Sequence, residues 1–239
     1  MRKSVFLLAL LLVGVMAACK TSDKNSGGGG TGGCGGGENA CGAETDVAQL
    51  MIDQYLNGTQ KASPWVALHE TVSVGQMWHV ESDFGAGKST DKWQVVAKPG
   101  KSEFIIENLS AQGVVLAYQV DAWADAGKPN VKKAWIGKEG AEPKEIKVAE
   151  WKAGTGEAGE APGIVVREDF ANVEMGGKKF DGEVIIVKDS GNTTKTWIAK
   201  NGWFSKLIRM DMNDKTMMKV TKAHFDEKVD TFLKWPEAK

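Results

Sequence analysis

Three histidines, His69, His79 and His224, are the side chains of this sequence best suited to metal binding or proton transfer. A neutral imidazole serves both purposes, and a catalytic zinc site uses three protein ligands. None of the three belongs to a His-x-x-x-His pair or has a glutamate at the spacing of a zinc motif. We therefore expect the histidines to lie apart on strand edges, and we predict no metal site.

A second candidate for chemistry is Gly85-Ala-Gly-Lys-Ser-Thr90, which contains the Gly-Lys-Ser ending of a phosphate-binding loop. Such a loop needs an earlier glycine, here at position 82, and a helix after the lysine. Position 82 is a serine, and the flanking residues favour strands. The segment is predicted to be a polar turn.

Other catalytic arrangements are not indicated by the sequence either. No serine lies in a Gly-x-Ser-x-Gly turn. The adjacent carboxylates Glu168 and Asp169 would point to opposite faces of a strand, which does not suit an acid and base pair. Lysine and arginine number 30 against 31 aspartates and glutamates, so no positive excess favours nucleic acid. The sequence predicts a protein that is not an enzyme, needs no cofactor and binds no nucleic acid.

The amino-terminal segment has the pattern of an export signal. Arg2 and Lys3 precede an apolar run, Val5 to Ala18, which is shorter than the roughly 20 residues that span a bilayer. The run ends in two alanines followed by Cys19, and this ending resembles the bacterial lipobox. The resemblance implies cleavage after residue 18, diacylglycerol on the Cys19 thiol and acylation of the new amino terminus. The alternative is an ordinary secretory signal in which the cysteine is incidental.

Residues 19–43 are predicted to be the lipidated cysteine and a flexible tether, because ten of the 24 residues from Lys20 to Ala43 are glycine. Cys34 and Cys41 lie in this tether and form an even pair, which suggests a disulfide in an exported chain. They could instead supply half of a metal site, but no histidine lies nearby to complete it. Lys20 follows the acylated cysteine where an aspartate would favour the inner membrane, so we expect the outer membrane, facing the periplasm or the cell surface.

Residues 44–239 are predicted to form a single, mainly β domain with one amphipathic helix over Glu44–Asn57. Thr45 or Asp46 can cap this helix, and its apolar face is expected to consist of Val47, Leu50, Met51 and Tyr55. After the helix, the hydrophobic period changes to two and turn signals recur. The predicted strands are Gly75–Phe84, Trp93–Lys98, Glu103–Asn108, Gly113–Trp123, Val131–Lys138, Glu145–Trp151, Ile164–Phe170, Asn172–Met175, Lys179–Lys188, Thr193–Lys200, Phe204–Asn213 and Lys215–Ala223. So many antiparallel strands predict a large curved meander with the helix covering one face.

The two halves of this domain look related. Lys133–Val148 aligns without gaps with Lys195–Met210, 62 residues later, and seven of the sixteen positions are identical. We interpret residues 93–151 and 164–225, approximately, as copies of one duplicated unit. Convergence of two hairpins on a common pattern is the alternative.

Nine tryptophans and an excess of methionine suggest either an adaptable apolar cavity or a well-filled core. Our candidate cavity residues are Trp135, Trp197, Met210 and Met212. The strands Thr193–Lys200 and Leu207–Met210 resemble the closing strands of the periplasmic lipoprotein-carrier and mycobacterial lipid-transfer lipoprotein families. That resemblance implies a half-barrel around a cavity that holds acyl chains.

The function expected from these observations is that of a membrane-anchored periplasmic lipoprotein that binds an apolar or lipidic ligand without transforming it. The alternative is a structural or interaction module that docks another envelope protein. A filled interior together with an exposed apolar edge would favour the alternative.

Overall fold

The computed structural model describes residues 46–66, 68–69, 71–85, 87–124, 128–151, 164–200 and 205–236. The predicted signal 1–18, Cys19, the tether 19–43, and the pair Cys34 and Cys41 lie outside these residues. They stay predictions.

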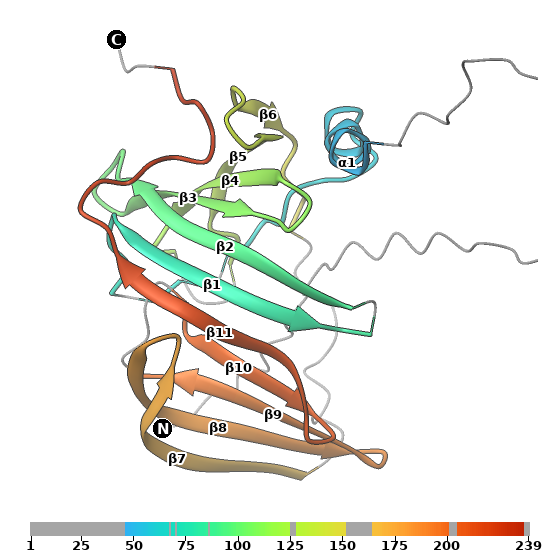
Figure 1. Ribbon diagram of the computed structural model, residues 1–239, viewed down its shortest axis with the longest axis vertical. Helices are drawn as coiled ribbons and strands as arrows, with labels where there is room; N and C mark the ends of the chain where they lie inside the picture. The colour runs from blue at the N-terminus through green and yellow to red at the C-terminus, as the bar shows by residue number, and fades with distance from the viewer. Residues whose placement is uncertain are drawn as a thin grey trace, which may run out of the picture. The chain divides into compact units, whose positions relative to one another are not determined.

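The described chain is mainly β, as predicted, and folds into an open, curved sheet of eleven antiparallel strands with one short helix (Figure 1). The strands are β1 (Gln76–Asp83), β2 (Lys88–Ala97), β3 (Glu103–Leu109), β4 (Val114–Asp121), β5 (Val131–Lys138), β6 (Lys144–Ile146), β7 (Ile164–Met175), β8 (Lys178–Asp189), β9 (Asn192–Ala199), β10 (Leu207–Met212) and β11 (Lys215–Phe225). Their order across the sheet is β6-β5-β4-β3-β2-β1-β11-β10-β9-β8-β7.

This order contains two meanders that meet at the first and the last strand. The chain runs from β1 in the middle of the sheet to β6 at one edge, restarts with β7 at the other edge, and returns through β11 to pair with β1 (Figure 1). The pairing is antiparallel, with Trp78 opposite Ala223 and Val80 opposite Val220. The sheet therefore depends on a contact between residues far apart in the sequence, which hairpin signals alone do not predict.

The helix α1 (Val47–Leu56) begins at Asp46, whose side chain accepts a hydrogen bond from the Gln49 amide at 3.0 Å. Asp46 also pairs with Lys138 of β5, and these two contacts, the lysine first, lower the pKa of the Asp46 carboxyl. The prediction of its buried face was wrong for two of the four residues, since Val47 is 53% and Leu50 50% exposed.

The buried face of α1 is rotated by one residue from the predicted face. Ala48, Met51, Ile52 and Tyr55 pack into the core, and they also follow the i, i+3, i+4, i+7 spacing of an amphipathic helix. Ile52 joins two of the expected residues on this face. The predicted face and the observed face both fit the helical period. The observed one is buried because it is the face that contacts β4, β5 and β6.

Two hydrophobic cores lie on opposite faces of the sheet. Core 1 includes Ala134 and Ile136 of β5 together with the helix, whereas core 2 includes the neighbouring Trp135. Alternate residues of a strand point to opposite faces, so the two cores flank the same strands. Core 1 lies under α1 and the segment that follows it; core 2 lies under the carboxy-terminal segment 230–235.

One strand begins earlier than predicted. β2 starts at Lys88, not Trp93, because Lys88, Ser89 and Thr90 pair with β1. The second half of the predicted polar turn Gly85–Thr90 is therefore strand.

Two other strand predictions also differ from the structure. The predicted strand Glu145–Trp151 is reduced to β6, which has three residues, because Val148 leaves the sheet to form a parallel bridge with Ala62. The two strands predicted over 164–175 are one strand, β7, with an irregularity after Phe170. Asn172 has a positive φ of 55° there, a conformation that asparagine tolerates better than most residues.

The aligned segments of the duplication hypothesis correspond to the hairpins β5–β6 and β9–β10. In the order of the sheet β5 is second and β9 ninth, so the two strands run in opposite directions. In both hairpins, however, the second strand lies on the side of the first that is nearer the β6 edge. A half-turn about the direction from the first strand to the second superimposes one hairpin on the other, and such a rotation exchanges the two faces of the sheet. The matching residues Trp135 and Trp197 therefore lie on opposite faces.

Candidate functional site

The structure does not bring the four candidate cavity residues together. Trp135 packs edge-to-face against Trp235 in core 2, with ring centroids 5.2 Å apart. Trp197 packs against Phe170 beside core 1, also at 5.2 Å. Met210 is half-buried, and Met212 is 41% exposed at the end of β10. These residues do not line one shared cavity.

The interior of core 1 is filled by large side chains from both halves of the sheet. Trp78 of β1 and Phe180 of β8 are 2% and 1% exposed, and their rings meet edge-to-face at 6.2 Å. Ile106, Ile136 and Ile208 are fully buried in the same core. This packing supports the interpretation of the aromatic residues as core.

His69 is a structural residue. It is 3% exposed, and its Nε2 lies 3.0 Å from the carbonyl oxygen of Lys200. Its Nδ1 accepts a hydrogen bond from the Thr71 amide at 3.1 Å. Both ring nitrogens therefore contribute to joining the segment after α1 to the end of β9.

His79 and His224 lie together, contrary to the expectation that all three histidines lie apart. Their rings are 5.9 Å apart on neighbouring strands β1 and β11. Burial, and then the nearby Lys222, lowers the pKa of His79. His224 is 3.2 Å from Asp226. No cluster of three or more metal-ligating side chains occurs within the described residues.

A buried carboxylate, which the sequence analysis missed, holds the carboxy-terminal segment on the sheet. Glu107 of β3 is fully buried and accepts four hydrogen bonds. The donors are the Trp235 indole at 2.7 Å, the amides of Phe232 at 2.6 Å and Leu233 at 3.2 Å, and the Gln94 side chain at 2.8 Å. We call this arrangement the Glu107 clasp.

Core 2 fits closely around the clasp. Leu233 is fully buried against Leu109, Val115 and Ala117. A Cβ atom at Gly137 would lie 2.8 Å from Leu233 Cδ2 and 3.2 Å from the Glu142 carbonyl oxygen, so a side chain at this position would require the leucine to move. The clasp and this close fit indicate a structural role for the segment.

A polar group also surrounds Trp197 on the other half of the sheet. Arg209 lies 5.6 Å from the Trp197 ring and donates to the buried Asp211 at 2.8 Å and to Thr216 at 3.1 Å. The buried Trp197 Nε1 has no hydrogen-bond partner among the described residues. The arrangement is an ion pair beside an aromatic ring.

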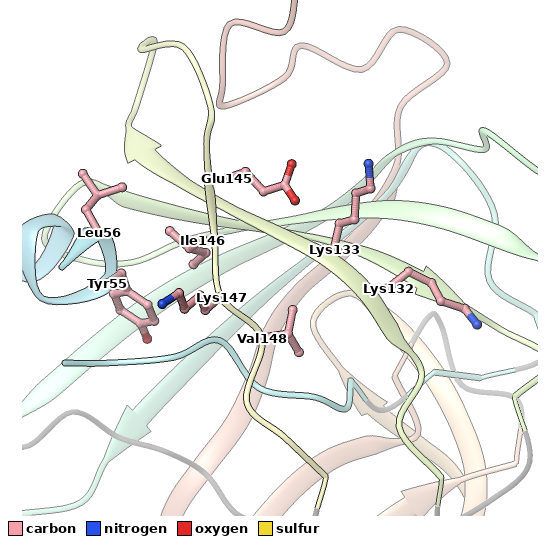
Figure 2. A pocket seen from close by; sticks show the side chains of 8 residues that line it. All are labelled: Tyr55, Leu56, Lys132, Lys133, Glu145, Ile146, Lys147 and Val148. Carbon is pink, nitrogen blue, oxygen red and sulfur yellow. The ribbon is translucent and has the colours of Figure 1, made fainter. Parts of the chain in front are cut away.

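The structure contains a surface cleft where β6 separates from β5, shown in Figure 2. We call it the fork cleft; it has a volume of about 470 Å³. Its walls are formed by the end of α1, the start of β5, and β6 with the residues after it. The lining residues are Tyr55, Leu56, Lys132, Lys133, Glu145, Ile146, Lys147 and Val148.

A second pocket, of about 510 Å³, lies at the tips of the hairpins β8–β9 and β10–β11. Lys195 and Asp214 line it and form an ion pair at 2.7 Å. This pair raises the pKa of Lys195 and lowers that of Asp214, through the hydrogen bond first. The two charges satisfy each other, so the pocket offers no unpaired charge from them.

The two edges of the sheet differ strongly. The β6 edge has only three residues, and the chain beyond it is bridged to Ala62. The β7 edge has twelve residues, and among the described strands it pairs only with β8. It begins with Ile164, Val165 and Val166, which are 66%, 42% and 37% exposed. An exposed strand edge carries unpaired N–H and C=O groups that can pair with another chain.

Comparison with known proteins does not assign the chain to a family. No protein-family model matches the sequence, and no curated protein matches it. Among solved structures, the chain is similar to PNGF-II, with a TM-score of 0.23 and 9% sequence identity. The match covers 65% of this chain and 28% of the PNGF-II chain. The site is therefore interpreted from its own geometry.

Some features missed from the sequence left a local signal. Glu107 lies between Ile105 and Leu109 at the alternate positions of a predicted strand, and a charge within a buried strand implies a partner. The sequence did not indicate which residues would be the partners, since two of the donors lie 126 residues or more away. Within the described residues, no helix has the length and apolar character that are needed to cross a membrane.

Proposed function

We propose that the protein is a lipid-anchored, non-catalytic interaction module of the bacterial cell envelope, and that it docks an extended segment of another envelope protein along β7. The observation that carries this proposal is the contrast between the two edges. One edge is short and bridged, and the other offers twelve residues that begin with three exposed β-branched side chains.

Pairing along an edge would satisfy the unpaired backbone groups of β7 and would cover Ile164, Val165 and Val166. Main-chain hydrogen bonds then provide affinity, and alternate side chains provide selectivity. The irregularity after Phe170 interrupts regular pairing, so the expected docking segment of β7 is Ile164–Phe170. The partner strand is expected to be apolar opposite Val165 and Val166, whereas Arg167 is already paired with Glu183 of β8 at 2.8 Å.

The anchor in this proposal rests on the sequence alone. The lipobox-like ending before Cys19 and the glycine-rich tether support an acylated protein held at the outer membrane. Metabolic labelling with palmitate tests this part separately. Labelling that persists in a Cys19→Ser variant would contradict acylation at Cys19.

Binding of a lipidic ligand inside the curved sheet has less support from the geometry, because aromatic and branched side chains occupy core 1. Native mass spectrometry of the protein distinguishes the two functions. A lipid that co-purifies and is released on denaturation would favour the ligand-binding function over docking.

Photo-crosslinking in cells tests the docking proposal. A photo-reactive residue at Ile164 is expected to give a discrete adduct with another envelope protein. The same residue at Lys144, on the short β6 edge, serves as the matched control and should give none. No adduct at Ile164, or the same adducts at both positions, would contradict docking along β7.

A further inference from the structure

The fork cleft is built by a local separation of two strands. Ala134, Trp135 and Ile136 of β5 pair with β6, but Lys132 and Lys133 lie beyond this pairing. On the other side, Lys147 turns away, and its carbonyl oxygen accepts a hydrogen bond from the Ala62 amide at 2.9 Å. The strands therefore diverge with a lysine on each side. In Figure 2 the Lys147 amine points toward Tyr55, and the Lys133 amine points away from it.

The cleft has a positive charge, since it is lined by Lys132, Lys133 and Lys147 and by one acidic residue, Glu145. Lys132 lies 3.6 Å from Asp121 and is partly neutralised. Within the described part of the chain, neither Lys133 nor Lys147 has an ion-pair partner. Both side chains are exposed, and lysine can reorient its amine at low cost on a flexible stem.

The base of the same cleft is apolar. Ile146 is 8% exposed, and its neighbour Val148 is half-buried. Leu56, at the carboxy-terminal end of α1, is 40% exposed although it borders this apolar surface. Two exposed lysines bordering apolar residues provide the features that an amphipathic anion needs, and the volume lies within the roughly 300–1,000 Å³ of small-molecule sites.

We propose that the fork cleft binds a small amphipathic anion, with a carboxylate or phosphate head between Lys133 and Lys147 and an apolar chain against Leu56 and Val148. The head gains charge-assisted hydrogen bonds from lysines on both sides of the fork. The chain covers apolar surface that is otherwise in contact with water. This site is separate from β7, so it does not depend on docking.

Isothermal titration calorimetry on the full chain carrying Cys19→Ser tests the proposal with four probes: dodecanoate, dodecyl phosphate, dodecanol and inorganic phosphate. At least one of the two anionic amphiphiles is expected to bind at least about tenfold more tightly than dodecanol and inorganic phosphate. The preference between dodecanoate and dodecyl phosphate identifies the head group. Equal binding of dodecanol would contradict the role of the lysines, and equal binding of inorganic phosphate would contradict the role of the apolar base.

Variants locate the binding on the surface. The double substitution Lys133→Gln, Lys147→Gln should weaken binding of the preferred anion by about tenfold or more, and Leu56→Asn should weaken it by several-fold. The matched control Lys188→Gln, Lys206→Gln removes the same charge from exposed positions on the other half of the sheet. A similar loss in this control, or no loss in the fork cleft variants, would overturn the assignment.

Discussion

The strands β3 to β5 and the strands β7 to β9 belong to one sheet, but they are covered differently. Core 1 and core 2 flank β4 and β5, so these strands have buried residues on both faces. In β7, by contrast, every residue is exposed or half-buried. The same antiparallel pairing therefore occurs in a part of the sheet that is covered on both faces and in a part that is accessible.

The cause of this difference lies outside the strands. The segment after α1, as far as Val66, and the carboxy-terminal segment both pack on the half that contains β3 to β5. Asn130 fixes the first segment through two hydrogen bonds with the backbone of Val66, at 2.8 and 2.9 Å, and the Glu107 clasp fixes the second. A sheet face becomes a core only where another element covers it.

The largest effect is expected from removing the Glu107 clasp. Glu107→Ala leaves the Trp235 indole, two backbone amides and the Gln94 side chain without their acceptor, so the free energy of unfolding should fall by about 3–5 kcal/mol. Urea unfolding measures this loss. Glu103→Ala on the same strand removes a half-buried carboxylate with one described donor, Gln119, and should cost about 1 kcal/mol. If both variants lost the same free energy of unfolding, the Glu107 clasp would contribute no more to stability than an ordinary half-buried carboxylate of the same strand.

Two apolar truncations compare the covered half with the accessible half directly. Leu233→Ala creates a cavity in core 2 and should lower the free energy of unfolding by about 2–4 kcal/mol. Met212→Ala removes a side chain that is 41% exposed and should change it by less than about 0.5 kcal/mol. If the two variants lose the same stability, the carboxy-terminal segment is not part of the folded core.

Sequence patterns predicted the parts of this fold that depend on local chemistry. Alternation and turn residues located eleven strands, because hairpin register is set by neighbouring residues. They did not predict the pairing of β1 with β11 or the Glu107 clasp, since both depend on residues far apart in the chain. The pairing of His79 with His224 was missed for the same reason.

The candidate site shows the same limit. Composition identified tryptophan and methionine as unusual, but it could not assign them to faces of the sheet. Trp135 and Trp197 occupy matching positions in two aligned hairpins, yet the opposite directions of β5 and β9 put them in different cores. The fork cleft depends on where β6 separates from β5, and no residue type marks that position in advance.

A smaller effect is expected from pH, at the junction of the two halves. Burial, followed by the charge of Lys222, lowers the pKa of His79, so the folded state binds this proton less readily than the unfolded state. The stabilising contribution is complete above the unfolded-state pKa of about 6.5. It decreases as the pH falls from that value toward the folded-state pKa.

Urea unfolding of the protein and of His79→Gln between pH 7.5 and 5 tests this expectation. The variant should lose less stability than the parent over the interval, because it cannot take up the proton. A parallel decrease in both proteins would assign the pH dependence to other groups.

The smallest effect on stability, with a large effect on docking, is expected at the accessible edge. Val165→Lys places a charge on β7, and lysine is a common protection of natural edge strands against pairing. The free energy of unfolding should change by less than about 0.5 kcal/mol, whereas the adduct from a photo-reactive residue at Ile164 should disappear. Phe225→Lys is the matched control, because Phe225 is 51% exposed on the interior strand β11, and this variant should keep the adduct. Loss of the adduct in both variants would attribute docking to general apolar exposure, and retention in both would remove β7 as the docking edge.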